Sequence, residues 1–236
     1  MAHRRKRNHR DPEVDRVIMQ LWNVIDDLER LLPAQSRWFR VTIFGSSRIA
    51  RGDALYNAAK ELAARLTGLG CDIVTGGGPG LMEAANEGAQ KGDVSRKTKS
   101  YGLHIELPFE YEPNRYIDRL SSHRTFFSRL HHFVRLSHAY VVLTGGIGTS
   151  LETFMIWQLL QVGYIQDRPL VLLGDMWNGL LEWMKKEMAP RHYLSAEDFD
   201  LVKVVSSIDD ATEIIKAQKE KFDRSMNLLY AVGGEH

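Results

Sequence analysis

The sequence predicts an α/β domain built on an open, mainly parallel β-sheet with helices on both faces. From residue 40 onward, short apolar runs that end in glycine alternate with segments of helical periodicity, which is the pattern of repeated strand–helix–strand units. The 236 residues suit one such domain in size. The sequence also lacks an internal repeat or a low-complexity linker. These observations favour one domain over several.

Each element of this fold has its own signal. Residues 12–32 are predicted to form an amphipathic helix that packs across the main unit, because apolar residues recur at helical spacing before Pro33. Strands are predicted where apolar residues run together, at 41–44, 72–75, 102–107, 140–143, 170–173 and 201–205. Helices are predicted between them, several beginning on Asp, Ser or Gly, at 53–68, 80–91, 124–136, 149–162, 176–188 and 208–222. The domain then covers 12–223, between a disordered basic tail, 1–11, and a mobile tail, 224–236.

Charge and hydropathy narrow the function classes. The net charge is +1, but five positive charges fall within residues 4–10, so the rest of the chain is mildly acidic. Nucleic-acid-binding domains normally carry a basic face, so we expect no nucleic-acid partner. No apolar run approaches the roughly 18 residues that cross a bilayer, and no signal-peptide-like stretch follows the basic amino terminus, so we expect a cytoplasmic protein without a membrane partner. The single cysteine, Cys71, is expected to be buried.

Three strand ends carry loops suited to an anion. In open parallel sheets, ligands bind at the carboxyl ends of the strands, where the strand order reverses. The first loop offers Gly45, Ser46 and Ser47. The second runs from Thr75 into a helix, and its glycines allow backbone amides to approach a phosphate at a helix amino terminus; the candidate residues are Gly76, Gly77, Gly78, Gly80, Met82 and Glu83. It matches neither the Walker nor the GxGxxG pattern, and the alternative is a tight turn without a ligand.

The third loop is also glycine-rich and also opens a helix. Its candidate residues are Gly145, Gly146, Gly148 and Thr149, with Ser150 beside them. Glu152 lies close behind and either complements the helix dipole or serves in catalysis. Two such loops in one domain predict a phosphate site that both loops share.

Taken together, residues 74–86 and 144–152 resemble the paired glycine motifs of the Lonely Guy (LOG) family. The likeness extends from about Val41 to about Trp183, and it includes residues 44–48, 107–108, 112–114, 126–129, 161–163 and 169–174. The resemblance implies a Rossmann-like homodimer or larger assembly that hydrolyses the N-glycosidic bond of nucleoside 5′-monophosphates, such as AMP or cytokinin riboside monophosphates, to free base and ribose 5-phosphate. It implies no cofactor and no metal.

The resemblance also carries the family's catalytic pair onto Arg129 and Glu152. Bond cleavage builds positive charge on the ribose, which a carboxylate stabilises while it orients a water or the ribose hydroxyls. Arg129 would clamp the substrate through its planar fork. Ordinary glycosidases use two carboxylates, and Glu83 is the other candidate, unless it only complements a helix dipole. Asn114 follows a strand end and is a further candidate to reach the ligand.

Three departures from the family pattern bear on activity: Thr144, Leu130 and Phe133 stand where the family usually has proline, lysine and methionine. The alternative function is therefore a binding or carrier protein for a nucleotide or phosphorylated cofactor, for example a molybdenum-cofactor carrier on the same fold. Proteins with these motifs are often labelled lysine decarboxylases, but no lysine here follows a strand in a setting suited to a pyridoxal phosphate Schiff base. His123, His131, His132 and His138 have no carboxylate or cysteine at a ligand-like spacing, so no metal site is expected.

Overall fold

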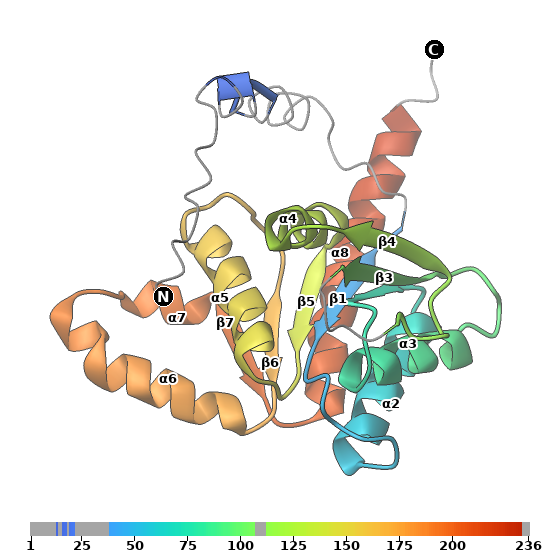
Figure 1. The fold of residues 1–236 in the computed structure, drawn as a ribbon, viewed down its shortest axis with the longest axis horizontal. Helices are drawn as coiled ribbons and strands as arrows, with labels where there is room; N and C mark the ends of the chain where they lie inside the picture. The colour runs from blue at the N-terminus through green and yellow to red at the C-terminus, as the bar shows by residue number, and fades with distance from the viewer. Residues whose placement is uncertain (1–12, 14–15, 18, 22–37, 107–111, 233–236) are drawn as a thin grey trace, which may run out of the picture. The chain divides into compact units, whose positions relative to one another are not determined.

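The computed structural model describes residues 13, 16–17, 19–21, 38–106 and 112–232 (Figure 1). The chain divides into two compact units, residues 1–36 and residues 37–236. In the first unit the described residues are all helical, in agreement with the helix predicted over 12–32. Its packing across the main unit stays a prediction, and the tail 1–11 lies outside the described residues.

The second unit is built on a seven-stranded sheet in the order β4-β3-β2-β1-β5-β6-β7, and every neighbouring pair is parallel. The strands are β1 Arg40–Phe44, β2 Asp72–Thr75, β3 Ser100–Ile105, β4 Arg119–His123, β5 Ala139–Val142, β6 Leu170–Leu173 and β7 Val202–Val205. The predicted open, mainly parallel sheet is confirmed. Because β1 pairs with both β2 and β5, the strand order reverses at β1, and the loops at this point splay apart.

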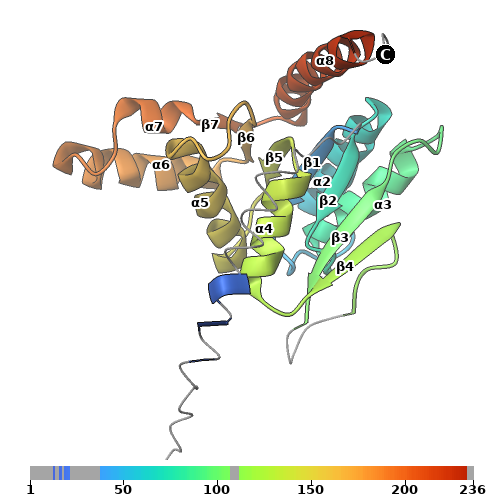
Figure 2. The ribbon, with the colours of Figure 1, turned by 90° about the horizontal axis from the view of Figure 1, so that it is seen from above.

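Helices cover both faces of the sheet (Figure 2) and connect successive strands, except that no helix is described between β3 and β4. They are α2 Ala54–Gly68, α3 Leu81–Gly92, α4 Phe126–Leu136, α5 Ile147–Gln161, α6 Met176–Glu187, η1 Ala189–Arg191, α7 Ala196–Asp200 and α8 Ile208–Val232. Side chains cap several of these helices: Asp53 accepts a hydrogen bond from Leu55 N before α2, Thr125 accepts one from Ser128 N before α4, and Ser207 accepts one from Asp210 N before α8. α3 and α5 instead begin after glycines, without a side-chain cap.

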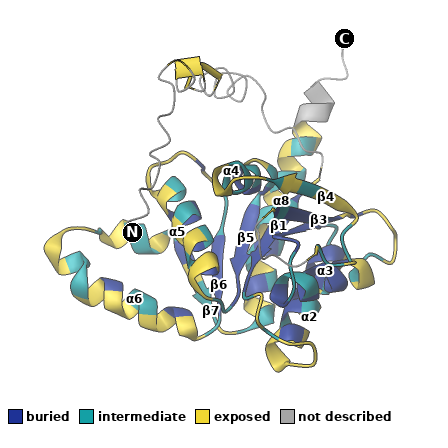
Figure 3. Cartoon of the chain, viewed as in Figure 1, coloured by how far each residue is buried: buried dark blue, intermediate teal, exposed yellow. Residues whose placement is uncertain are grey.

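The core has two layers because strand side chains alternate between the faces of the sheet. On β1, Val41 and Ile43 pack against α2, α3 and α8, whereas Phe44 packs against α4 and α5. Figure 3 shows the strands as the most buried part of the molecule. Cys71, which immediately precedes β2, is fully buried, and burial raises the pKa of its thiol to about 12. The prediction of a buried cysteine is confirmed.

Four elements differ from the sequence prediction: η1 and α7, which were not predicted, and β4 and α8. The strand β4 was not predicted, because its residues, Arg-Leu-Ser-Ser-His, carry no apolar run and lie at the edge of the sheet. The helix α8 continues beyond the predicted end at residue 222 as far as Val232, because neither glycine nor proline occurs before Gly233. Residues 233–236 of the predicted tail lie outside the described part of the chain. Among the helices that the structure describes, none is long and apolar enough to span a bilayer, and the cytoplasmic location stays a prediction.

Candidate active site

A cavity of about 640 Å³ opens at the carboxyl ends of β1, β2 and β5, where the strand order reverses. Most of the residues that the sequence nominated line it together: Gly45, Ser46, Ser47, Gly76, Gly78, Met82, Arg129, Gly146, Gly148, Thr149 and Glu152. Three loops and the helices α3, α4 and α5 thus contribute to one pocket. The cavity is also lined by residues that the sequence did not nominate for the site: Arg48, Pro79, His104, Phe126 and Ile147.

The first turn of α5 forms one wall of the cavity. Ile147, Gly148 and Thr149 are its first three residues, and all line the cavity. The preceding residue, Gly146, provides no side-chain cap, so the amides of this turn are not capped by a side chain at residue 146. Unpaired amides at a helix amino terminus attract anions. This wall is therefore suited to a phosphate group.

The opposite wall is the loop between β2 and α3. Here the first helical amide is already used, because Leu81 N donates to Ser46 O at 2.9 Å. The close approach requires glycine at position 80, where φ is +71° and a Cβ would lie 2.4 Å from Ser46 O. At Gly76 the close neighbours are side chains, because a Cβ there would lie 2.2 Å from Arg129 Nη2. This loop is packed tightly against the first loop and against the arginine.

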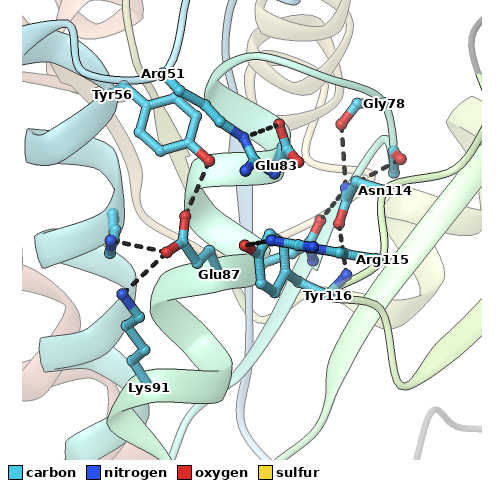
Figure 4. Close-up of polar contacts among 12 residues, drawn as sticks. Arg51, Tyr56, Gly78, Glu83, Glu87, Lys91, Asn114, Arg115 and Tyr116 are labelled. Carbon is cyan, nitrogen blue, oxygen red and sulfur yellow. Dashed lines mark hydrogen bonds and ion pairs between the residues drawn. The ribbon is translucent and has the colours of Figure 1, made fainter.

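Four nominated residues do not line the cavity. Gly77 has φ of +76° and packs against Gly102, and its amide donates to Thr75 Oγ1 at 3.0 Å. Gly145 packs against the side chain of Thr149. Gly80 packs against the first loop, as described above. Glu83 forms an ion pair with Arg51 instead of facing the cavity (Figure 4). The structure therefore does not bring Glu83 and Glu152 together in the cavity.

Arg129 and Glu152 face each other across the cavity floor. Arg129 comes from α4 and Glu152 from α5, and Arg129 Nη2 lies 3.7 Å from Glu152 Oε1. Their side chains are only 11% and 13% exposed. Arg129 Nε donates to Leu103 O at 2.8 Å, and the guanidinium lies over the Phe133 ring with 5.5 Å to its centroid. Both contacts fix the direction of the arginine fork.

Burial raises the pKa of Glu152 to about 7, although the nearby positive charge of Arg129 acts in the opposite direction. The carboxyl therefore changes protonation state near neutral pH. Groups with such pKa values exchange protons most effectively under physiological conditions. A displaced pKa beside a charged partner in a cavity is typical of a functional site.

The histidines that the sequence analysis excluded as metal ligands do not line the cavity. His123 Nε2 and His132 Nδ1 share a hydrogen bond of 3.0 Å, and His138 Nδ1 accepts one from Arg40 N. Within the described residues, no group of three or more His, Cys, Asp or Glu side chains is arranged to hold a metal ion. Asn114 contacts the glycine loop and does not line the cavity.

The unpredicted lining residues carried weak sequence signals. His104 is the next-to-last residue of β3, and Phe126 is the first residue of α4. Each therefore lines the cavity because of its position at the end of β3 or at the start of α4. Arg48 directly follows the nominated Ser47 in the loop after β1. Strand order would have been needed to place all three in one pocket.

The fold and this cavity define a Rossmann-like α/β protein with a candidate site at the switch point of its sheet. Residues 82–216 match the family model described as "Possible lysine decarboxylase", and the chain belongs to that family, which is the LOG family. The resemblance read from the glycine motifs is confirmed.

The chain is similar to several curated proteins of that family. It is 29% identical over 194 residues to the pyrimidine/purine nucleotide 5′-monophosphate nucleosidase of Escherichia coli (strain K12), a match that covers 76% of this chain and 40% of the relative. The chain thus spans less than half the length of this relative. It is 25% identical over 206 residues to a probable cytokinin riboside 5′-monophosphate phosphoribohydrolase of Oryza sativa subsp. japonica, with coverage of 84% and 78%.

Solved structures share the fold. The molybdenum cofactor binding protein of Rippkaea orientalis superposes with a TM-score of 0.59 at 18% identity, with coverage of 78% of this chain and 98% of the other. The molybdenum cofactor carrier protein of Chlamydomonas reinhardtii gives a TM-score of 0.56, also at 18% identity, and covers 78% and 99%. At this identity the likeness establishes the Rossmann-like fold alone.

Proposed function

We propose that the chain hydrolyses the N-glycosidic bond of a nucleoside 5′-monophosphate and releases the free base and ribose 5-phosphate. The observation that carries this proposal is the pair Arg129 and Glu152, largely buried, in a cavity whose wall is the amino terminus of α5. Membership of the family and the names of the curated relatives support the same reaction class.

The phosphate binds at the first turn of α5 in this proposal. The amides of Gly148 and Thr149, the Thr149 hydroxyl and the hydroxyls of Ser46 and Ser47 surround it, and Arg48 supplies positive charge. Binding the phosphate fixes the ribose relative to Glu152, so binding energy far from the reacting bond positions the sugar.

The reaction then takes place at C1′ of the ribose. The bond to the base breaks, its electron pair leaves with the base, and water adds to C1′. Ionised Glu152 stabilises the positive charge that develops on the sugar and takes a proton from the attacking water. Arg129 holds the ribose hydroxyls, and its positive charge favours the ionised carboxyl against the effect of burial. The departing base then gains a proton, so the overall reaction consumes one water.

We further propose that two copies of the chain associate through the exposed faces of α4 and α5. Large apolar side chains are exposed beside the cavity there, with Phe127 81%, Ile147 89%, Leu151 46% and Phe154 41% accessible. Adjacent exposed apolar side chains are typical of protein interfaces. Light scattering of the purified chain should give twice the monomer mass, and Leu151→Glu should shift it toward the monomer. A monomeric wild-type chain would contradict this interface.

The reaction is tested by incubating the purified chain with AMP, GMP, CMP, UMP and a cytokinin riboside monophosphate and measuring free base by chromatography. We expect base release from at least one of them and none from the corresponding nucleosides, because the phosphate site would be empty. Tight binding without release from any monophosphate would overturn the proposal and favour the carrier function.

A further inference from the structure

Asn114 contacts the glycine loop before α3 and does not line the cavity. It belongs to the segment between β3 and β4, and its side chain is half-buried. Its Nδ2 donates to Gly77 O at 3.0 Å, to Gly78 O at 3.1 Å and to Asn86 Oδ1 at 2.9 Å (Figure 4). Its backbone amide also donates to Gly77 O, at 2.8 Å. One side chain thus holds two consecutive carbonyl groups of the loop.

The hydrogen-bond pattern fixes which end of the Asn114 amide faces the loop. Three acceptor oxygens surround Nδ2, whereas Oδ1 accepts from Tyr116 N at 3.1 Å. The reversed orientation would place Oδ1 against three oxygens and the NH₂ group against a donor. The site therefore needs a hydrogen-bond donor, and a carboxylate of the same shape would be repelled.

The partner Asn86 is itself held in place. It is fully buried, its Oδ1 accepts from Thr75 Oγ1 at 2.7 Å, and its Nδ2 donates to Ser100 Oγ at 2.7 Å. Thr75 Oγ1 in turn accepts from Gly77 N. This network connects the glycine loop to the end of β2 and the start of β3, so the residue that Asn114 binds, Asn86, is held in place by both strands.

The direction of the loop amides follows from peptide geometry. In a trans peptide the C=O and the following N–H point in opposite directions. Because Gly77 O points to Asn114, the amide of Gly78 points away from Asn114, and Gly78 is one of the residues that line the cavity. Pro79 has no amide hydrogen, so Gly78 is the donor that this part of the loop can offer to a ligand.

We infer that Asn114 is a positioning residue that aims the Gly78 amide at the phosphate and, through Gly76, sets the place of Arg129. Gly76 itself contacts Arg129, because Arg129 Nη2 occupies the space where a side chain at Gly76 would begin. This inference deepens the proposed function and rests on it for the identity of the ligand. It concerns binding, so it can be tested without turnover.

The test measures the dissociation constant of AMP by calorimetry for the wild type, Asn114→Asp and Asn114→Ala at pH 7.5. Asn114→Asp should weaken AMP binding about ten- to hundredfold, because a carboxylate repels the two carbonyl groups, and Asn114→Ala should weaken it less. Asn178→Asp is the matched control, because Asn178 is exposed on α6 and the substitution adds the same charge. The control should bind AMP as the wild type does.

A second measurement separates positioning from a general loss of structure. Three acceptor oxygens surround this position and should raise the pKa of the carboxyl in Asn114→Asp, so at about pH 5 the carboxyl gains a proton and regains one donor, and AMP affinity relative to that of the wild type at the same pH should recover. Asn114→Ala should show no such recovery. Wild-type AMP affinity in Asn114→Asp, or a loss that is unchanged at low pH, would overturn the inference.

The outcome also separates this inference from the proposed reaction. If the wild type binds AMP but releases no adenine, the proposed hydrolysis fails while the Asn114 measurements still decide the positioning role. If Asn114→Asp binds AMP normally, the positioning role fails whatever the turnover. A wild type that binds neither AMP nor inorganic phosphate would overturn both.

Discussion

The two glycine loops resemble each other in sequence but differ in what they offer to a ligand. The loop before α5 presents a helix amino terminus without a side-chain cap, and Glu152 follows it on the same helix. The loop before α3 has its first helical amide bound to Ser46 O and its carbonyl groups bound to Asn114. Its acid, Glu83, is bound to Arg51. The loop before α5 forms most of the proposed anion site, whereas the loop before α3 contributes the Gly78 amide and packs against the arginine and the loop after β1.

The largest expected effect comes from Glu152, which follows the loop before α5. Glu152→Ala should reduce base release about 10²- to 10⁴-fold, because the group that stabilises the ribose cation and accepts the proton is lost. AMP affinity should stay nearly unchanged, because a carboxylate repels an anion. Single-turnover base release and calorimetry measure the two quantities. An equal collapse of AMP affinity would show that Glu152 has a structural role and that the loops do not differ as described.

Gly76→Ala tests the close packing of the loop before α3 against Arg129. A methyl group at Gly76 would lie 2.2 Å from Arg129 Nη2, so the guanidinium must move. We expect base release to fall about 10²-fold, since displacements of about 1 Å in a catalytic group have effects of this size. Gly179→Ala is the matched control, because a methyl group there meets no atom within 4 Å. Activity of Gly76→Ala equal to that of the control would refute the close packing.

The pKa of Glu152 predicts how stability depends on pH. Folding raises this pKa from 4.5 to about 7, so the folded state favours the neutral carboxyl, and wild-type stability falls as the pH rises through 7. Glu152→Gln lacks this loss and should be the more stable chain above pH 8, by roughly 3 kcal/mol at most. The advantage should disappear toward pH 4.5. Urea denaturation across this range measures it, and a constant difference would contradict the raised pKa.

The smallest effect is expected at Glu83. Its partner Arg51 is exposed, so the ion pair is screened by solvent, and Glu83 does not line the cavity. Glu83→Gln should keep base release within about fivefold of the wild type. A loss comparable to that of Glu152→Ala would mean that Glu83 is the second carboxylate of a glycosidase pair.

The sequence predicted the parts of this molecule that depend on local patterns. Apolar runs placed all the strands except β4, whose polar residues at the sheet edge carry no such signal. The pairing of Arg129 with Glu152 came from the resemblance to the LOG family and not from a local pattern. What the sequence did not supply was the direction of each peptide: Gly77 and Gly78 are adjacent and chemically identical, but only Gly78 lines the cavity. That direction depends on Asn114, whose contacts with the loop no local pattern indicates.

Glu83 and Glu152 illustrate the same limit. Each follows a glycine loop on the first or second turn of a helix, so sequence reasoning nominated both. Their surroundings differ because Arg51, from the loop after β1, reaches Glu83, whereas Arg129 reaches Glu152. Which acid meets which arginine depends on the order of the strands, and only the sheet topology supplies it.

The buried thiol at residue 71 gives this chain a reporter of its own unfolding. Only a thiolate reacts readily with alkylating reagents, and a thiol with a pKa of about 12 at the base of β2 is shielded until the sheet opens. Because the sequence contains one cysteine, the rate of labelling reports the exposure of Cys71 alone. A ligand that binds at the far ends of the same strands should slow that labelling in proportion to its affinity, and no engineered label is needed to detect it.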